Sequence, residues 1–180
     1  RVHSKCTVKK PSQYNNMSKQ EVLEKFESLN VWKRGDQRAT HKPLLVLLAL
    51  SRWQQGKNRL DFESTAPRLI QLLQEFGPKR KTNHPELPFY HLQTDGIWKM
   101  TTSGDPQPRK GSSSFTSREL IDHHANGQFT EDVLDVLEHD PAVAGEIAIR
   151  ILDAHFPESL HSEILSAVGL DTDLRQVSRR

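Results

Sequence analysis

The stretch HKPLLVLLAL at residues 41–50 decides how this 180-residue chain folds. Its last seven residues are all apolar, so the segment has no polar face and is expected to be buried on every side. Pro43 suits the first helical position, because its φ is already helical and its missing N–H would have no partner there. Gly56 is expected to terminate the segment. The sequence therefore predicts a central core helix over residues 43–55.

Basic side chains crowd the predicted start of this helix. Within ten residues of it lie Lys33, Arg34, Arg38, His41 and Lys42. A helix N-terminus presents free N–H groups and the positive end of the helix dipole, and both favour a bound anion. One such cation alone would need no functional explanation. The whole cluster favours phosphate binding.

Composition excludes several classes of protein. The single cysteine, Cys6, cannot form an internal disulfide or a cysteine-based zinc site, and it suits a reducing compartment. No apolar run approaches the roughly 18 residues of a membrane span, and the N-terminus lacks the apolar middle of a signal peptide. We therefore expect a cytoplasmic protein, and we predict no metal site and no cofactor.

Charge is distributed unevenly along the chain. Residues 128–171 contain ten acidic residues and one basic residue, Arg150, which gives this segment a net charge of −9 although the whole chain carries +2. The remainder is therefore strongly basic, which favours a polyanion partner; the alternative is two oppositely charged halves that dock or keep the protein soluble. Residues 17–171 are expected to form one domain. We interpret residues 1–16 as a flexible extension or expression remnant and residues 172–180 as a basic tail.

Helical patterns dominate the rest of the domain. Ser18 and Glu21 form a capping box ahead of an amphipathic helix over residues 19–29, and Ser64 is expected to cap a helix that ends near Phe76. A brief strand is predicted over residues 59–62. The sequence also predicts four further helices, at about 116–125, 130–138, 141–155 and 158–168, and the acidic ones are interpreted as a scaffold.

A β-hairpin is predicted where residues 87–93 and 97–100 flank the dipeptide Asp95-Gly96. The fold class is thus α+β, a mainly α-helical single domain with a small antiparallel hairpin. Pro88 cannot donate to a β ladder, so we expect it at a strand start or edge, exposed or lining a cavity. The hairpin follows a second basic loop, residues 78–85, and would set an apolar surface beside the phosphate site.

Catalytic arrangements are not evident. The pair His123-His124 could suggest an HNH nuclease, but it has no cysteine pairs and no suitable Asp-His partner nearby. A restriction-type site needs Asp followed by Glu-x-Lys on adjacent strands, and the segment Asp61-Phe62-Glu63 lacks the lysine. We therefore predict no catalytic residues in this chain.

Several motifs together resemble the sulfur-binding domain of phosphorothioate-dependent, McrA-like type IV restriction endonucleases. They are RATHKPLL at 38–45, FGP at 76–78, HPELPF at 84–89, DGIW at 95–98, LDAHFP at 152–157 and IL with VGL within 164–170. The resemblance covers about residues 17–171 in the same order. It implies a reader of double-stranded DNA in which a sulfur replaces a non-bridging phosphate oxygen, within a modification-dependent restriction system. It also implies an HNH nuclease domain or subunit as a partner, in a monomer or homodimer, and no enzyme activity in this chain.

The resemblance also assigns site residues. It places Arg34, His41 and Lys42 around the modified phosphate, and it forms the sulfur pocket from Leu87, Pro88 and His91, beside His41. An arginine after the hairpin is also implied, and Arg109 and Arg118 are the candidates. The full set of expected phosphate contacts is Arg34, Arg38, Lys42, Lys79, Arg80, Lys81 and Arg109, and the expected base contacts are Gln37, Thr82 and Asn83.

Two alternatives remain open at this point. The domain could read duplex DNA irrespective of modification, with the hairpin acting as a wing. It could also be a metal-dependent nuclease that uses His123 or His124. Sulfur recognition in an apolar pocket predicts discrimination of tens- to a few hundredfold, because a dehydrated oxygen without a hydrogen bond costs about 1–3 kcal/mol.

Overall fold

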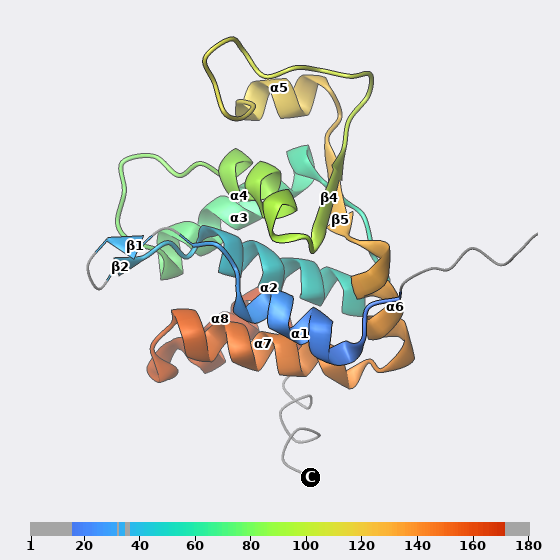
Figure 1. Ribbon diagram of the computed structural model, residues 1–180. Helices are drawn as coiled ribbons and strands as arrows, with labels where there is room; N and C mark the ends of the chain where they lie inside the picture. Colours follow the sequence, from blue (N-terminus) through green and yellow to red (C-terminus); the bar gives the residue numbers. More distant parts are fainter. Residues whose placement is uncertain (1–15, 32, 35–36, 172–180) are drawn as a thin grey trace, which may run out of the picture.

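The computed structural model describes residues 16–31, 33–34 and 37–171, with the backbone alone at 33–34 and 37–38. The fold is α+β and mainly helical, as predicted, and a small antiparallel sheet lies to one side of the central helix (Figure 1). The elements of this part of the chain, in order, are α1 (Lys19–Glu27), β1 (Lys33–Arg34), β2 (Gln37–Arg38), α2 (His41–Gln54), β3 (Leu60–Asp61), α3 (Phe62–Phe76), α4 (Glu86–His91), η1 (Leu92–Asp95), β4 (Trp98–Thr101), α5 (Ser117–Asp122), β5 (Asn126–Phe129), α6 (Glu131–His139), α7 (Ala142–His155), η2 (Glu158–Leu160) and α8 (His161–Val168).

Helix α2 forms the centre of the fold. Every residue from Pro43 to Ser51 is buried, and α3, α4, α7 and α8 all pack against this helix. A segment that is apolar on every side can be stable in water only when other elements cover it completely. The predicted core helix is confirmed, although it begins two residues earlier, at His41.

The starts of the two flanking helices follow local capping chemistry. The predicted capping box of α1 is present: the Ser18 hydroxyl accepts from the Glu21 N–H at 3.2 Å, and the Glu21 carboxylate accepts from the Ser18 N–H at 2.6 Å. For α3, the predicted cap Ser64 is wrong. The N-cap is Asp61, whose carboxylate accepts the Ser64 N–H at 2.9 Å, so the helix starts at Phe62 directly after β3.

The sheet has the order β3-β5-β4, and both pairings are antiparallel. Strand β5, residues Asn126–Phe129, was not predicted. It lies between the predicted helices at 116–125 and 130–138, and its residues NGQF carry little β signal. Gly127 is required at its centre, since a Cβ there would lie 2.1 Å from the Trp98 ring. The glycine leaves room for the indole beside the strand backbone, which no short-range pattern reveals.

The predicted hairpin over residues 87–100 is wrong. Residues Glu86–His91 form helix α4, and the 3-10 turn η1 follows it. Pro88 fits the first turn of a helix as well as a strand edge, because neither position needs its N–H. Gly96, with φ of 71°, ends η1 and redirects the chain into β4. Strand β4 pairs with β5, the strand that follows it in the chain after helix α5, and not with the segment 87–93 that the sequence assigned as its partner.

A two-stranded antiparallel ribbon occurs instead inside the first basic loop. Its strands are β1 and β2, and their register pairs Lys33 with Arg38 and Arg34 with Gln37. The sequence suggested only an irregular basic loop at this point. The ribbon leads directly into the first turn of α2.

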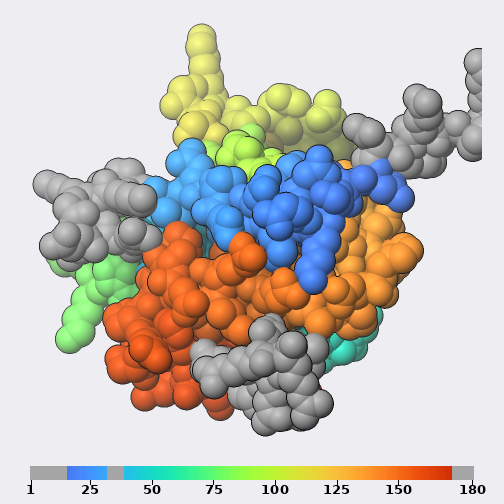
Figure 2. All heavy atoms as spheres, turned by 60° about the horizontal axis from the view of Figure 1, so that its bottom comes forward, coloured from blue at the N-terminus to red at the C-terminus, as the bar shows by residue number. Residues whose placement is uncertain are grey.

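The helices α7 and α8 lie on the opposite side of α2 from α4, and the acidic helix α6 packs against α7 (Figure 1). Figure 2 shows this face, on which the orange-to-red C-terminal helices lie beside the blue helix α1. Lys19 of α1 reaches Glu146 of α7 at 2.8 Å, and Arg150 pairs with Glu27.

Helix α5 is shorter than the predicted helix over 116–125, because it ends at Asp122 and the chain turns through His123 and His124. Across the described residues, every helix is too short or too polar to cross a membrane.

Candidate nucleic-acid interface

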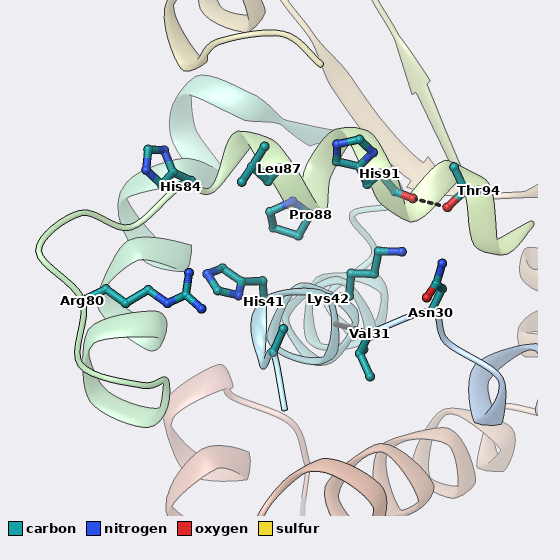
Figure 3. Close-up of a pocket in the computed structure, with 11 residues that line it drawn as sticks. Asn30, Val31, His41, Lys42, Arg80, His84, Leu87, Pro88, His91 and Thr94 are labelled. Carbon is teal, nitrogen blue, oxygen red and sulfur yellow. Dashed lines mark hydrogen bonds between the residues drawn. The ribbon is translucent and has the colours of Figure 1, made fainter. Parts of the chain in front are cut away.

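A cavity of about 680 Å³ opens at the N-terminal end of α2. Five segments converge on it: the chain after α1, the first turn of α2, the basic loop 78–85, α4 and η1 (Figure 3). The lining residues are Asn30, Val31, Ala39, His41, Lys42, Arg80, His84, Leu87, Pro88, His91 and Thr94.

Helix α4 supplies the apolar wall of the cavity. Leu87, Pro88 and His91 line the same side of the cavity, since Leu87 and Pro88 precede His91 by four and three positions and so neighbour it on the helix surface. Leu87 is 39 % exposed and is the one large apolar side chain left exposed among the described residues. Its neighbour Phe89 points into the core, where its ring meets Phe62 edge-on at 5.0 Å. The helix thus turns an apolar edge toward solvent while its other face anchors it.

Two histidines of the cavity are held in the neutral form. Burial lowers the pKa of His41, and the charges of Arg80 and His84 lower it further. Burial also lowers the pKa of His91, with a second contribution from Lys42. Because the ordinary histidine pKa is about 6.5, the uncharged form of both imidazoles predominates at neutral pH.

The one lysine among the described lining residues is already paired. Lys42 donates to the Asp95 carboxylate across 2.6 Å, and the two side chains are only 12 % and 4 % exposed. The other oxygen of this carboxylate accepts the backbone N–H of Asn30 at 2.7 Å. This pair joins α2 to η1 and fixes the chain that enters the cavity from α1.

A second buried carboxylate supports the basic loop. Glu86 accepts from the Ser117 hydroxyl at 2.7 Å and bonds His84 Nδ1 at 2.8 Å, and it is buried at the start of α4. The loop side chain His84 is therefore tied to both α4 and α5. This network holds the loop against the apolar wall.

The cavity gathers many of the residues that the sequence singled out. His41, Lys42, Arg80, Leu87, Pro88 and His91 all line it, although Pro88 stands on a helix rather than a strand. Lys79, Lys81, Thr82 and Asn83 occupy the same basic loop as Arg80 without lining the cavity. For Arg34, Gln37 and Arg38 the structure describes the backbone alone, so their expected contacts lie outside the described residues.

Other candidates lie elsewhere. Arg109 is exposed and pairs with Glu119 at 2.8 Å, and Arg118 pairs with Asp122 on the same helix at 3.1 Å. His123 and His124 form the turn between α5 and β5 and do not line the cavity. In the part of the chain that the structure describes, no three His, Cys, Asp or Glu side chains are grouped to hold a metal ion.

Sequence reasoning missed several lining residues. Asn30, Val31, Ala39, His84 and Thr94 were not assigned to the site, and neither were the supporting carboxylates. A signal for part of this set was present: the spacing of residues 84, 87, 88, 91 and 94 follows one helical face. A helix predicted over residues 86–95 would have placed residues 87, 88, 91 and 94 along one side of it.

Comparison with known proteins identifies the family of the chain. The family described as "ScoMcrA-like, DNA sulfur-binding domain" matches residues 19–173. No curated protein sequence matches the chain significantly.

Solved structures share the fold at low sequence identity. The sulfur-binding domain of SprMcrA complexed with phosphorothioated DNA is 18 % identical, with a TM-score of 0.70 over 86 % of this chain and 95 % of that one. The corresponding ScoMcrA domain complexed with phosphorothioated DNA is also 18 % identical, with a TM-score of 0.71 over 82 % and 94 %. The type IV phosphorothioation-dependent restriction endonuclease ScoMcrA aligns over 82 % of this chain and 32 % of its own, with a TM-score of 0.66. The chain belongs to the ScoMcrA-like DNA sulfur-binding domain family.

Proposed function

We propose that this chain binds double-stranded DNA that carries a phosphorothioate in its backbone, and that the sulfur enters the cavity beside α2. Family membership supports the ligand class. The single observation that carries the proposal is the apolar wall of α4, whose Leu87 and Pro88 lie beside a paired lysine and an exposed basic loop. DNA with an ordinary backbone would interact favourably with the cations alone. A sulfur-bearing backbone would interact favourably with both the cations and the apolar wall.

The apolar wall accounts for preference between sulfur and oxygen. Sulfur is larger and more weakly hydrated than oxygen, so it loses less on leaving water. An oxygen placed against Leu87 and Pro88 would lose hydration without a hydrogen bond, at about 1–3 kcal/mol. Burying the sulfur adds a gain similar to one buried methylene, about 0.8 kcal/mol.

The histidines of the cavity suit this role in their neutral form. A neutral imidazole is a weaker partner for a phosphate oxygen than an imidazolium, because charge-assisted hydrogen bonds are about twice as strong. Lowered pKa values at His41 and His91 therefore reduce attraction for an oxygen at the centre of the cavity.

Overall affinity comes from the rim. Arg80 lines the cavity and remains exposed, and Lys79 and Lys81 flank it in the same exposed loop. Contacts between such cations and phosphates release counterions and make binding salt-dependent without conveying sequence. Thr82 and Asn83 follow in this loop and are the candidates for base contacts.

The biological role that fits is recognition within a modification-dependent restriction system. An HNH nuclease domain or subunit would then cut the DNA that this module has bound. The chain itself is proposed to act without catalysis, as a monomer or homodimer.

Two duplexes of identical sequence, one with a single phosphorothioate and one without, test the proposal at fixed salt. The separated phosphorothioate diastereomers should be measured alongside, because a shaped cavity favours one of them. We expect tens- to a few hundredfold tighter binding of the preferred diastereomer. Equal affinity for all three duplexes would refute sulfur recognition and leave a reader of unmodified DNA.

A further inference from the structure

We propose that Asp95 is a positioning residue that sets the preference for sulfur over oxygen, by holding the Lys42 ammonium away from the entering phosphate. The inference rests on the proposed function and deepens it. It assigns a role to a carboxylate that does not itself line the cavity.

The geometry of the pair supports this role. Lys42 lies in the first turn of α2, and its side chain forms part of the cavity wall between His41 and Asn30 (Figure 3). Its ammonium contacts Asp95 at 2.6 Å, and Asp95 is almost fully buried. The second carboxylate oxygen is occupied by the Asn30 N–H. The carboxylate therefore has fixed partners on both sides and holds the ammonium at the edge of the wall.

The other described polar groups of the wall are uncharged or lie at the rim, and among them the Thr94 hydroxyl donates to the His91 carbonyl. His41 and His91 are neutral, as their surroundings require, and His84 is bonded through Nδ1 to Glu86. Arg80 is exposed on the basic loop. Lys42 is the strong donor that the first turn of α2 contributes to the wall, near enough to His91 for its charge to lower the pKa of that histidine, and Asp95 occupies it.

A free ammonium at this position would remove the basis of selection. An oxygen that enters the cavity is disfavoured because nothing replaces its hydration. An unpaired lysine would replace it with a charge-assisted hydrogen bond, which a compact oxygen accepts better than a large, diffuse sulfur. Releasing Lys42 should therefore strengthen binding of ordinary DNA more than binding of phosphorothioate DNA.

Asp95→Asn is the decisive substitution. The asparagine oxygen can still accept the Asn30 N–H, while its amide group faces the ammonium and can no longer bind it. We expect affinity for the oxygen duplex to rise and the sulfur preference to fall about tenfold. Asp122→Asn is the matched control, because it removes one negative charge from an exposed pair on α5. This control should leave the preference unchanged.

The double variant Lys42→Met with Asp95→Asn completes the test. It removes both charges together and keeps an apolar stem in the wall, so neither partner is left buried and unpaired. We expect it to restore the wild-type preference within about twofold and to keep the wild-type salt slope. This rescue requires that Asp95 act through Lys42, which a merely structural role would not produce.

Each result has a defined meaning. An unchanged preference in a folded Asp95→Asn protein, or equal loss of affinity for both duplexes, would show that Asp95 only pins the chain near Asn30. If Asp95→Asn does not fold by circular dichroism, the double variant decides. In the double variant, a slope of log affinity against log salt that is reduced by about one would show that Lys42 itself contacts phosphate. That result would overturn the inference. The wild-type preference tests the proposed function separately, since it is measured without any substitution.

Discussion

The two layers that flank α2 use the same core helix in different ways. On one side, α7 and α8 cover it with aliphatic side chains and carry exposed acidic residues. On the other, α4 and η1 cover its first turn only in part and leave a cavity in which His41 and His91 are partly buried and Lys42 and His84 are paired. Stability should therefore depend on the first layer and recognition on the second.

The largest expected effect is a loss of stability from a substitution in the layer formed by α7 and α8. Ile147 of α7 is fully buried, so Ile147→Ala should lower the free energy of unfolding by about 2–5 kcal/mol through lost burial and a residual cavity. Denaturant unfolding measures this loss, with Ile147→Val as the graded control at about 0.5–1.5 kcal/mol. The sulfur preference of the folded fraction should not change. A changed preference would mean that the two layers are coupled.

Pro88→Ala tests the cavity layer. Alanine keeps the helix but removes part of the apolar wall, so we expect the sulfur preference to fall about tenfold, equivalent to about 1.4 kcal/mol. Binding of paired duplexes at one salt concentration measures it. Pro141→Ala is the matched control, because Pro141 is exposed and precedes α7 at the far layer. A loss of affinity for both duplexes without a change in preference would place the sulfur elsewhere.

Arg80→Ala separates affinity from preference. Removing this exposed cation should weaken the binding of both duplexes about threefold to tenfold. It should also reduce the slope of log affinity against log salt concentration by about one, because one phosphate contact is lost. Titrations at several salt concentrations provide both quantities. Lys57→Ala is the control, since Lys57 is exposed just beyond the opposite end of α2. A selective loss of phosphorothioate binding would instead make Arg80 part of the sulfur pocket.

The smallest expected effect is the pH dependence of stability. Lowered pKa values at His41 and His91 mean that the folded protein binds fewer protons than the unfolded chain near pH 6.5. The stability that these two histidines contribute to the folded protein is fully present above about pH 6.5. It is lost as the pH falls from there through the folded-state pKa values. The lowered pKa values of Glu21 and Glu119 act only at lower pH, below about 4.5.

Melting temperatures at pH 7.5 and 5.5 check this sign. The decrease on acidification should be smaller in the double variant His41→Gln with His91→Gln than in the wild type. Replacing the exposed His139 by Gln is the control and should not alter the decrease. An identical decrease in all three proteins would contradict desolvation of the cavity histidines.

Sequence reasoning succeeded where the signal was local or continuous. The capping box at Ser18 and the apolar run that forms α2 are confirmed, because both depend on neighbouring residues alone. It was wrong at residues 87–100, where an Asp-Gly pair between β-prone runs mimicked a hairpin. It also missed β5, whose pairing partners lie on β3 and β4, far away in the chain.

The sequence by itself determined a basic helix start, an acidic helical layer and a set of residues that resemble one family. Only the tertiary structure decided that α4 stands as a helix over the first turn of α2 and that Asp95 meets Lys42. Those contacts join residues about fifty positions apart, and chain-local propensity carries no information about which buried charge finds which partner. Burial decides it, because a carboxylate and an ammonium withdrawn from water are stable only together.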